Sequence, residues 1–273
     1  MSSRLRPTSA QGRVREAVIL MAGSGSRLRG SDEAFLKPLV PILGQPLISY
    51  TIAALIRAGI RKINAVVGFE SQRLIDALKQ LVPPGIGIHP IENREWQKQN
   101  GISVLAAKDN VGAPFLLTMS DHLFDDAIID LLIESADLNC LNLAIDKKLN
   151  SIFDLADAMK VQAHRNRVTA IGKDLPEYNA IDTGLFVCSE EIFDYLERAK
   201  SSSRGSDCSL ADGIRLMAAE NKVRAVDIGD RWWQDVDTPA MLSHAQQLLR
   251  TRSRRHHSAT SGARVQPCDS REH

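Results

Sequence analysis

The sequence is poor in several features, and each shortage excludes a class of protein. Aromatic residues make up only 5% of the chain. The longest uninterrupted apolar stretches, such as 17–22 and 114–117, fall far below the ~20 residues needed to cross a bilayer. The basic N-terminus also has no apolar segment of the kind that secretory signals carry. These absences predict a cytoplasmic protein with no stable membrane insertion.

The cysteines are few and scattered. None of the four, Cys140, Cys188, Cys208 and Cys268, lies at CxxC spacing from another. This pattern argues against both a cysteine zinc site and a disulfide framework. We therefore expect thiols that are buried or incidental.

The net charge of +1 conceals an uneven distribution along the chain. Residues 1–15 carry four arginines and no acid, whereas 250–273 carry six arginines against two acids. The stretch 16–249 holds 24 lysines and arginines against 31 acidic residues. Neither basic end has interleaved aromatics or an amphipathic period, so we predict a flexible tail at 1–15, a disordered tail at 250–273, and no nucleic-acid partner.

Strand-like and helix-like segments alternate in the first half of 16–249. The predicted strands are Ala17–Ala22, Lys62–Val67, Ile86–His89 and Phe115–Met119. The predicted helices are Pro46 to a stop at Gly59, Ser71–Leu81 and Gly101–Lys108. Such a βαβ rhythm is typical of parallel strands with helices on both faces of a sheet.

The second half adds strands that we expect to include antiparallel pairs. The predicted strands are Leu141–Ile145, Ala158–Ala163, Arg167–Ile171 and Val223–Ile228. The predicted helices are Glu190–Ala199, Leu210–Glu220 and a last one from Pro239 to about Leu249, with a surface loop at Ser201–Ser209. Together the halves predict one α/β domain, 16–249, with a three-layer α/β/α Rossmann-like fold around a mixed, mostly parallel sheet.

A buried strand, a glycine-rich turn and two spaced cations follow one another near the N-terminus. Gly23 and Gly25 end the first strand and let the backbone approach a ligand, so that N–H groups can point at phosphate oxygens. Arg27 offers a guanidinium fork for phosphate, and Lys37 adds a compact point charge. This combination predicts a site for a nucleoside triphosphate.

Two better-known glycine loops do not fit this segment. A dinucleotide fingerprint would place a third glycine where Leu28 stands, and a P-loop would place a lysine where Ser31 stands. The remaining alternative is an ordinary glycine turn after a first strand.

The segments LMAGSGSRL and LKPL resemble the signature of the nucleotidyltransferase superfamily. The sequence departs from it in the residues SDEAFL before Lys37, where many members have a proline directly ahead of the lysine. The resemblance implies that Leu20, Ala22, Gly23 and Gly25 bind the nucleotide. It also implies catalytic roles for the two cations, with Arg27 at the β,γ-phosphates and Lys37 at the α-phosphate.

Three aspartates are candidates for metal binding. Asp121 follows the apolar run Phe115–Met119, so it should lie at the carboxyl edge of a central strand, although an aspartate there can also cap the next helix. Asp235 and Asp237 alternate around a valine and should share a face. Carboxylate oxygens are the ligands that Mg²⁺ prefers. The neighbouring His122 should point to the opposite face.

The superfamily resemblance narrows these candidates. MSDHLF and WQDVDTP match its metal motifs, which implies Mg²⁺ ligation by Asp121 and Asp237 in preference to Asp235. The resemblance also implies base recognition by Asn100-Gly101-Ile-Ser103, with the glycine admitting the ring and the serine bonding to it. A capped helix start is the alternative for that segment.

Three further segments, DAMKVQ, VTAIGKDLPEYNAIDTG and LADGIRLMAAENKVRAVDIG, resemble CTP:inositol-1-phosphate cytidylyltransferases. That resemblance implies that Lys160 and Lys173 face the phosphate of the acceptor. It further implies that Asn179, Asp182 and Thr183 bond to the polyol hydroxyls. The adjacent tryptophans 232 and 233 either cover the polyol ring or pack in the core.

The combined prediction is an enzyme that transfers CMP from CTP to a phosphorylated polyol, most specifically inositol-1-phosphate, with Mg²⁺ as cofactor. The alternatives are a sugar-1-phosphate or phosphocholine nucleotidyltransferase on the same fold, a glycosyltransferase that consumes nucleotide sugars, and a non-catalytic member of the superfamily. The acceptor, the base and a homodimeric state are not fixed by these patterns.

Overall fold

The computed structural model describes residues 14–29 and 35–261. Most of the two predicted tails, 1–15 and 250–273, therefore lies outside the described residues. Val14 is buried, and the carbonyl of Arg15 accepts the N–H of Arg61 at 3.0 Å. These two residues, which the predicted tail included, are therefore part of the packed domain.

Within the described residues, the main sheet has nine strands in the order β5-β4-β1-β6-β11-β8-β12-β10-β9. Its N-terminal half contains β1 (Glu16–Met21), β4 (Lys62–Val67), β5 (Gly87–Glu92) and β6 (Phe115–Met119). All neighbouring pairs in this half are parallel. The expected βαβ arrangement is confirmed.

The C-terminal half of the sheet is mixed. It contains β8 (Leu141–Asp146), β9 (Lys160–His164), β10 (Arg167–Gly172), β11 (Ala180–Cys188) and β12 (Val223–Asp227). Strands β8 and β12 are parallel, whereas β11 runs antiparallel to β6, β8 and β9, and β10 runs antiparallel to β9 and β12. Within this sheet, only β10 and β11 therefore run in the opposite direction to the other described strands. This confirms a mixed, mostly parallel sheet.

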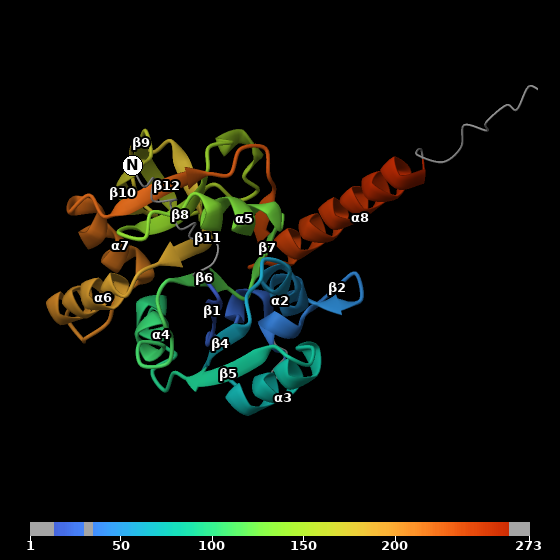
Figure 1. The fold of residues 1–273 in the computed structure, drawn as a ribbon, viewed down its shortest axis with the longest axis horizontal. Helices are drawn as coiled ribbons and strands as arrows, with labels where there is room; N and C mark the ends of the chain where they lie inside the picture. The colour runs from blue at the N-terminus through green and yellow to red at the C-terminus, as the bar shows by residue number, and fades with distance from the viewer. Residues whose placement is uncertain (1–13, 30–34, 262–273) are drawn as a thin grey trace, which may run out of the picture.

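Two separate hydrophobic cores show that helices cover both faces of the sheet (Figure 1). One face carries α4 (Asn100–Ala106), α6 (Glu191–Ser202) and α7 (Leu210–Ala219). The other carries α2 (Leu47–Arg57), α3 (Ser71–Leu81) and α5 (Ala127–Glu134). In β1, Val18 and Leu20 enter the first core while Ala17, Ile19 and Met21 enter the second. The three-layer α/β/α fold is confirmed.

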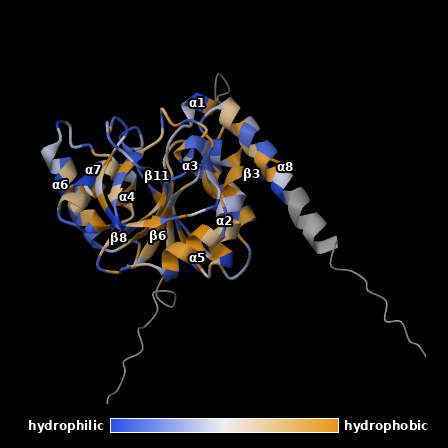
Figure 2. Cartoon of the chain, turned by 90° about the horizontal axis from the view of Figure 1, so that it is seen from above, coloured by the Kyte–Doolittle hydropathy of each residue, from blue (hydrophilic) through white to orange (hydrophobic). Residues whose placement is uncertain are grey.

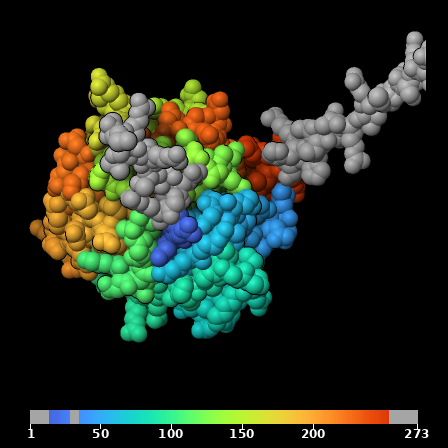
Figure 3. Space-filling model, in the orientation of Figure 1, coloured from blue at the N-terminus to red at the C-terminus, as the bar shows by residue number. Residues whose placement is uncertain are grey.

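The strands between these layers are apolar on both faces, and the helices turn their apolar sides toward them (Figure 2). Burial of apolar surface on both faces explains why the strands are continuous hydrophobic runs. The N-terminal segments, drawn blue to cyan, and the segments drawn yellow to orange lie on opposite sides of the molecule, whereas the red helix α8 returns to the blue N-terminal side (Figure 3).

The elements that were not predicted from the sequence include the central strand β11, helix α5, and the short antiparallel strands β7 (His122–Phe124) and β13 (Trp233–Asp235). The pairing of β7 with β13 matters for function, because it brings the segment after β6 beside the segment that contains Asp235 and Asp237.

The last helix, α8 (Pro239–Ser261), continues past its predicted end at about Leu249. Its Ala245, Leu242 and Leu249 belong to a small third core with Ile42 and Leu47. The helix then projects from the body of the domain (Figure 1). Across the described residues, no helix combines the length and the hydropathy needed to span a membrane.

Candidate active site

The site lies at the carboxyl edge of the parallel strands, where open α/β sheets bind ligands. Strands β1 and β6 are parallel neighbours, and each is followed there by a loop. The N–H of Ser120, just beyond β6, bonds to the carbonyl of Leu20 at 3.0 Å. The glycine loop after β1 and the aspartate after β6 therefore start from the same point of the sheet edge.

A first cavity of about 420 Å³ opens above this edge. It brings together most of the predicted nucleotide-binding residues: Leu20, Ala22, Gly23, Gly25, Asn100 and Ser103. Both predicted cations and both predicted metal ligands also line it: Arg27, Lys37, Asp121 and Asp237. The segment Trp96 to Lys98 completes the lining and was not predicted.

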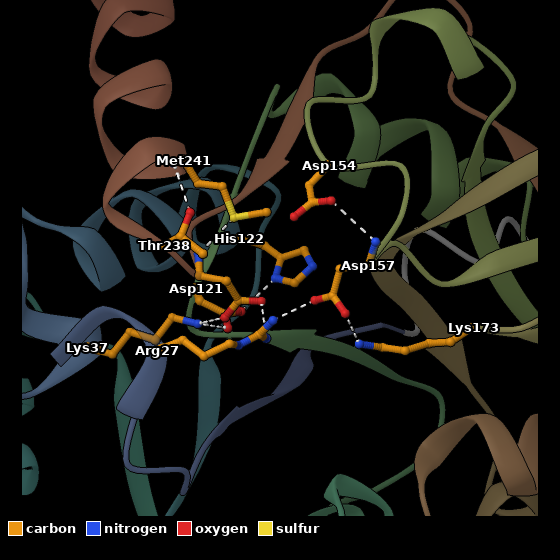
Figure 4. Close-up of polar contacts among 10 residues, drawn as sticks. Arg27, Lys37, Asp121, His122, Asp154, Asp157, Lys173, Thr238 and Met241 are labelled. Atoms are coloured by element: carbon orange, nitrogen blue, oxygen red, sulfur yellow. Dashed lines mark hydrogen bonds and ion pairs between the residues drawn. The ribbon is translucent and has the colours of Figure 1, made fainter. Parts of the chain in front are cut away.

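Lys37 joins the two candidate metal ligands. Its Nζ lies 2.5 Å from Oδ2 of Asp121 and also donates to Oδ1 of Asp237 (Figure 4). The lysine begins the 3₁₀ turn η2 (Lys37–Leu39) and is only 8% exposed. Two carboxylates from distant segments thus converge on one buried cation.

The electrostatics of this cluster favour the charged forms of Lys37 and Asp121. Burial alone would lower the pKa of Lys37, but the charges of Asp121 and Asp237 outweigh it and raise that pKa. Burial alone would raise the pKa of Asp121, but Lys37 and His122 hold it far below its usual value. Ion pairing therefore compensates for the loss of water around each group.

His122 does not point away from the site, so that expectation was wrong. Its Nδ1 lies 2.7 Å from Oδ1 of Asp121, and its ring stacks on Trp233 with centroids 5.9 Å apart. Burial would lower the pKa of His122, but the carboxylates of Asp121, Asp235 and Asp182 raise it. The histidine therefore orients Asp121. The expected alternation failed because the chain turns at 120–121 before β7 begins.

Gly101 was predicted to admit the base, but it does not line the first cavity. A Cβ on Gly101 would lie 2.5 Å from the carbonyl oxygen of Cys208, so glycine is required there for close packing of α4 against the chain before α7. Ser103 does face the cavity, and its Oγ accepts a hydrogen bond from Nδ2 of Asn93 at 3.0 Å. The serine hydroxyl keeps its own proton available for a ligand.

A second cavity of about 530 Å³ adjoins the first, and Arg27, Asn100, Asp121 and Asp237 line both. Of the predicted acceptor residues, Lys173 and Asp182 line it. Trp232 and Trp233 also face it, and Nε1 of Trp233 donates to Asp146 at 3.0 Å. The two cavities therefore meet at Asp121 and Asp237, the carboxylates that Lys37 joins.

Three predicted acceptor residues do not reach this cavity. The amide of Asn179 bonds to the backbone of Ala163, and Oγ1 of the fully buried Thr183 donates to a carbonyl of β8. Nζ of Lys160 donates to the carbonyl of Lys173 at 2.7 Å. Each side chain holds the second half of the sheet together, and Lys160 supports the residue that does face the cavity.

Asp235 and Asp237 both face the second cavity while Val236 between them is fully buried, which confirms their expected alternation. Only Asp237 also lines the first cavity. Burial raises the pKa of Asp235, whereas the charge of His122 lowers it by a smaller amount. Burial likewise raises the pKa of Asp182 to about 6.

The donor set at the junction fits a divalent cation. Asp121 and Asp237 present two anionic oxygens to one cationic group, and hard divalent cations prefer such oxygens. A cluster of three or more His, Cys, Asp or Glu ligands does not occur within 14–29 and 35–261.

A Rossmann-like sheet with a glycine loop, a buried lysine and paired carboxylates at its carboxyl edge is typical of a protein that handles nucleotide phosphates. Comparison with known families agrees. A family described as "Nucleotidyl transferase" matches residues 16–252. The chain belongs to this nucleotidyltransferase family, as its motifs predicted.

Similar proteins include two named "Bifunctional IPC transferase and DIPP synthase". The one from Aquifex aeolicus is 29% identical over 86% of this chain and 52% of its own length. The one from Thermococcus kodakarensis is 32% identical over 85% of this chain and 50% of its own length. The chain thus spans about half the length of these curated relatives.

Solved structures show the same fold. The inositol-1-phosphate CTP transferase from T. maritima superimposes with a TM-score of 0.77 at 27% identity, covering 86% of this chain and 94% of that one. A UDP-glucose pyrophosphorylase in complex with UDP-glucose reaches a TM-score of 0.75 at 16% identity, covering 88% and 99%. The second likeness establishes the fold alone.

Proposed function

We propose that this chain transfers CMP from CTP to inositol-1-phosphate, forming CDP-inositol and releasing pyrophosphate. The proposal rests on the Lys37–Asp121–Asp237 cluster, which lies where the two cavities meet. The first cavity lies beside the glycine loop, and the second is lined by polar side chains. The similar IPC transferases and the inositol-1-phosphate CTP transferase supply the identity of the two substrates.

The first cavity receives CTP in this proposal. The backbone of the glycine loop and Arg27 hold the β- and γ-phosphates, and Lys37 lies beside the α-phosphate. Ser103 donates its hydroxyl proton to the base, because Asn93 already occupies an acceptor position on its oxygen.

The second cavity receives the acceptor. Lys173 binds its phosphate, and Asp182 accepts hydrogen bonds from ring hydroxyls. A non-bridging oxygen of the acceptor phosphate attacks the α-phosphorus of CTP. A new P–O bond forms as the bond from the α-phosphorus to the β-bridging oxygen breaks, and the electron pair leaves with pyrophosphate. The attacking oxygen is already ionised, so no general base is required.

Asp121 and Asp237 are the residues that would hold Mg²⁺. When bound, the ion supplies positive charge that offsets the negative charge gathered around the reacting phosphates. Lys37 keeps Asp121 ionised and holds the two carboxylates close together, and His122 fixes the orientation of Asp121.

A sugar-1-phosphate acceptor is the second candidate, because the cavity walls carry the carboxylates and tryptophans that also suit hexoses. Phosphocholine lacks hydroxyls, so it would donate no hydrogen bond to the second carboxylate oxygen of Asp182, whose Oδ1 already accepts the N–H of Gly184.

The test is a pyrophosphate-release assay with four nucleoside triphosphates crossed with inositol-1-phosphate, several sugar-1-phosphates and phosphocholine. We expect CTP with inositol-1-phosphate to give the highest kcat/KM and phosphocholine to be lower by orders of magnitude. Comparable kcat/KM for phosphocholine or glucose-1-phosphate would refute the inositol assignment. A preference for GTP or UTP would refute the role of Ser103.

A further inference from the structure

A carboxylate outside the Lys37 cluster stands between two cations where the cavities meet. Oδ2 of Asp157 accepts from Nη1 of Arg27 at 2.5 Å, and its Oδ1 accepts from Nζ of Lys173 at 2.5 Å (Figure 4). Nη2 of Arg27 also donates to Asp237 at 2.6 Å. Arg27 and Asp157 are 130 positions apart in sequence, so this contact links the two halves of the domain.

The backbone around Asp157 and Lys173 is held independently of this contact. The N–H of Asp157 points to Oδ1 of Asp154 at 3.3 Å, and the carbonyl of Asp154 accepts the N–H of Ala158 at 3.2 Å. The carbonyl of Lys173 is held by Lys160. Both side chains can therefore exchange partners without a change in the backbone.

The Asp157 carboxylate is an anion of the kind that both cations bind during the proposed reaction. The hydrogen bond from Lys173 lowers the pKa of Asp157 most, burial opposes it, and Arg27 lowers it further. In the proposed reaction, Arg27 turns to the triphosphate and Lys173 to the acceptor phosphate. Each substrate thus removes one of the two partners of Asp157.

We propose that Asp157 occupies the place of the acceptor phosphate in the free protein and couples the two substrate sites. When a triphosphate binds Arg27, Asp157 loses one of the two contacts that fix its carboxylate. The carboxylate can then move away from Lys173, and the lysine can bind a phosphomonoester. By linkage, the phosphomonoester strengthens triphosphate binding by the same factor. This inference rests on the proposed function for the identity of the substrates, but the coupling itself requires only a triphosphate and a phosphomonoester.

The side chains of Arg27, Asp157 and Lys173 are 53%, 35% and 50% exposed. Ion pairs this exposed to water are screened, so each changes an affinity by only about two- to fivefold. We therefore expect a coupling factor in that range, and a decline in it as the salt concentration rises.

The experiment is isothermal titration calorimetry on the full chain. The dissociation constant of inositol-1-phosphate is measured without and with saturating α,β-methylene-CTP, which cannot react. Asp157→Asn removes the anion, whereas Asp174→Asn removes the same charge from an exposed position beside Lys173 and serves as the matched control. Melting temperatures verify that both variants fold.

The wild type and Asp174→Asn should bind inositol-1-phosphate about two- to fivefold more tightly with the CTP analogue than without it. Asp157→Asn should bind it more tightly even without the analogue and show no further gain. Equal coupling in Asp157→Asn and wild type, or weaker acceptor binding by Asp157→Asn, would overturn the inference.

A parallel titration separates this inference from the proposed function. Inorganic phosphate replaces inositol-1-phosphate, and inorganic triphosphate replaces the CTP analogue. Coupling that is present in the wild type and absent in Asp157→Asn supports the inference even if inositol-1-phosphate fails as an acceptor. Absence of coupling between these two anions in the wild type contradicts it.

Discussion

The main chain of Gly25 lies against the side chain of Lys37: a Cβ on the glycine would be 2.6 Å from Cβ of the lysine. Gly25 also has φ of +63°, a conformation that L side chains rarely adopt. The glycine loop therefore does more than expose its N–H groups to phosphate. It fixes the stem of the lysine that joins Asp121 and Asp237.

The first prediction follows from this contact. Gly25→Ala should displace Lys37 and lower kcat by ~10-fold or more, because the lysine charge must be correctly placed when the phosphates react. Gly112→Ala is the control, since that Cβ meets only Glu16 at 3.4 Å at the opposite edge of the sheet. Steady-state kinetics would check both variants, and normal kcat in Gly25→Ala would show that the contact is not required.

The second prediction concerns the charge of Lys37 itself. Lys37→Met keeps most of the stem but removes the ammonium that pairs with Asp121 and Asp237, so kcat should fall by ~10²-fold or more. Circular dichroism would verify that the variant is folded. Near-normal kcat with unchanged KM would mean that the lysine is structural.

The third prediction separates the two neighbouring aspartates. Asp237→Asn should abolish Mg²⁺-dependent turnover, whereas Asp235→Asn should cost less, because only Asp237 lines both cavities and bonds to Lys37. Titration of activity against Mg²⁺ concentration would measure this. The reverse order of severity would assign the metal to Asp235.

The fourth prediction is a pH dependence of stability. The pKa of Asp182 is about 6 in the folded protein because burial disfavours its charge, whereas the unfolded value is near 3.8. Its ionisation therefore destabilises the fold as pH rises from about 4 through 6, and the full cost is present above that range. Asp182→Asn removes this cost.

Relative to wild type, the unfolding free energy of Asp182→Asn should rise by about 1–2 kcal/mol between pH 4.5 and 7.5. Urea unfolding of both proteins at the two pH values would measure the change. A difference that is constant with pH would show that Asp182 ionises normally in the fold.

Much of the fold was visible in the sequence, because the strands of the N-terminal half are buried on both faces and appear as continuous apolar runs. The central strand β11 escaped notice because Asp182 and Thr183 interrupt its apolar pattern. The register of β11 against β8 shifts between Asp182 and Phe186, and this irregularity turns a polar side chain to the cavity. A polar residue that lines the cavity thus interrupted the pattern by which a core strand is recognised.

The candidate site was predictable where local motifs define it and unpredictable where it depends on long-range contacts. The glycine loop and Asp121 follow from strand ends, whereas the preference for Asp237 over Asp235 came from the superfamily resemblance. No local motif marks Asp157, because its ion pair with Arg27 joins residues that are 130 positions apart in sequence. Lys160 and Thr183 were expected to face the acceptor and do not. That prediction was wrong because the sequence does not show which side of a mixed sheet a residue faces.

In the proposed reaction, an oxygen of the acceptor phosphate attacks the α-phosphorus of CTP in the junction between the two cavities. Inositol-1-phosphate with ¹⁸O in the non-bridging oxygens of its phosphate, followed by mass spectrometry of the products, tests this step. We expect CDP-inositol to retain all of the label, with one labelled oxygen in the diphosphate bridge, and pyrophosphate to carry none. Label in pyrophosphate, or CDP-inositol without label, would contradict it.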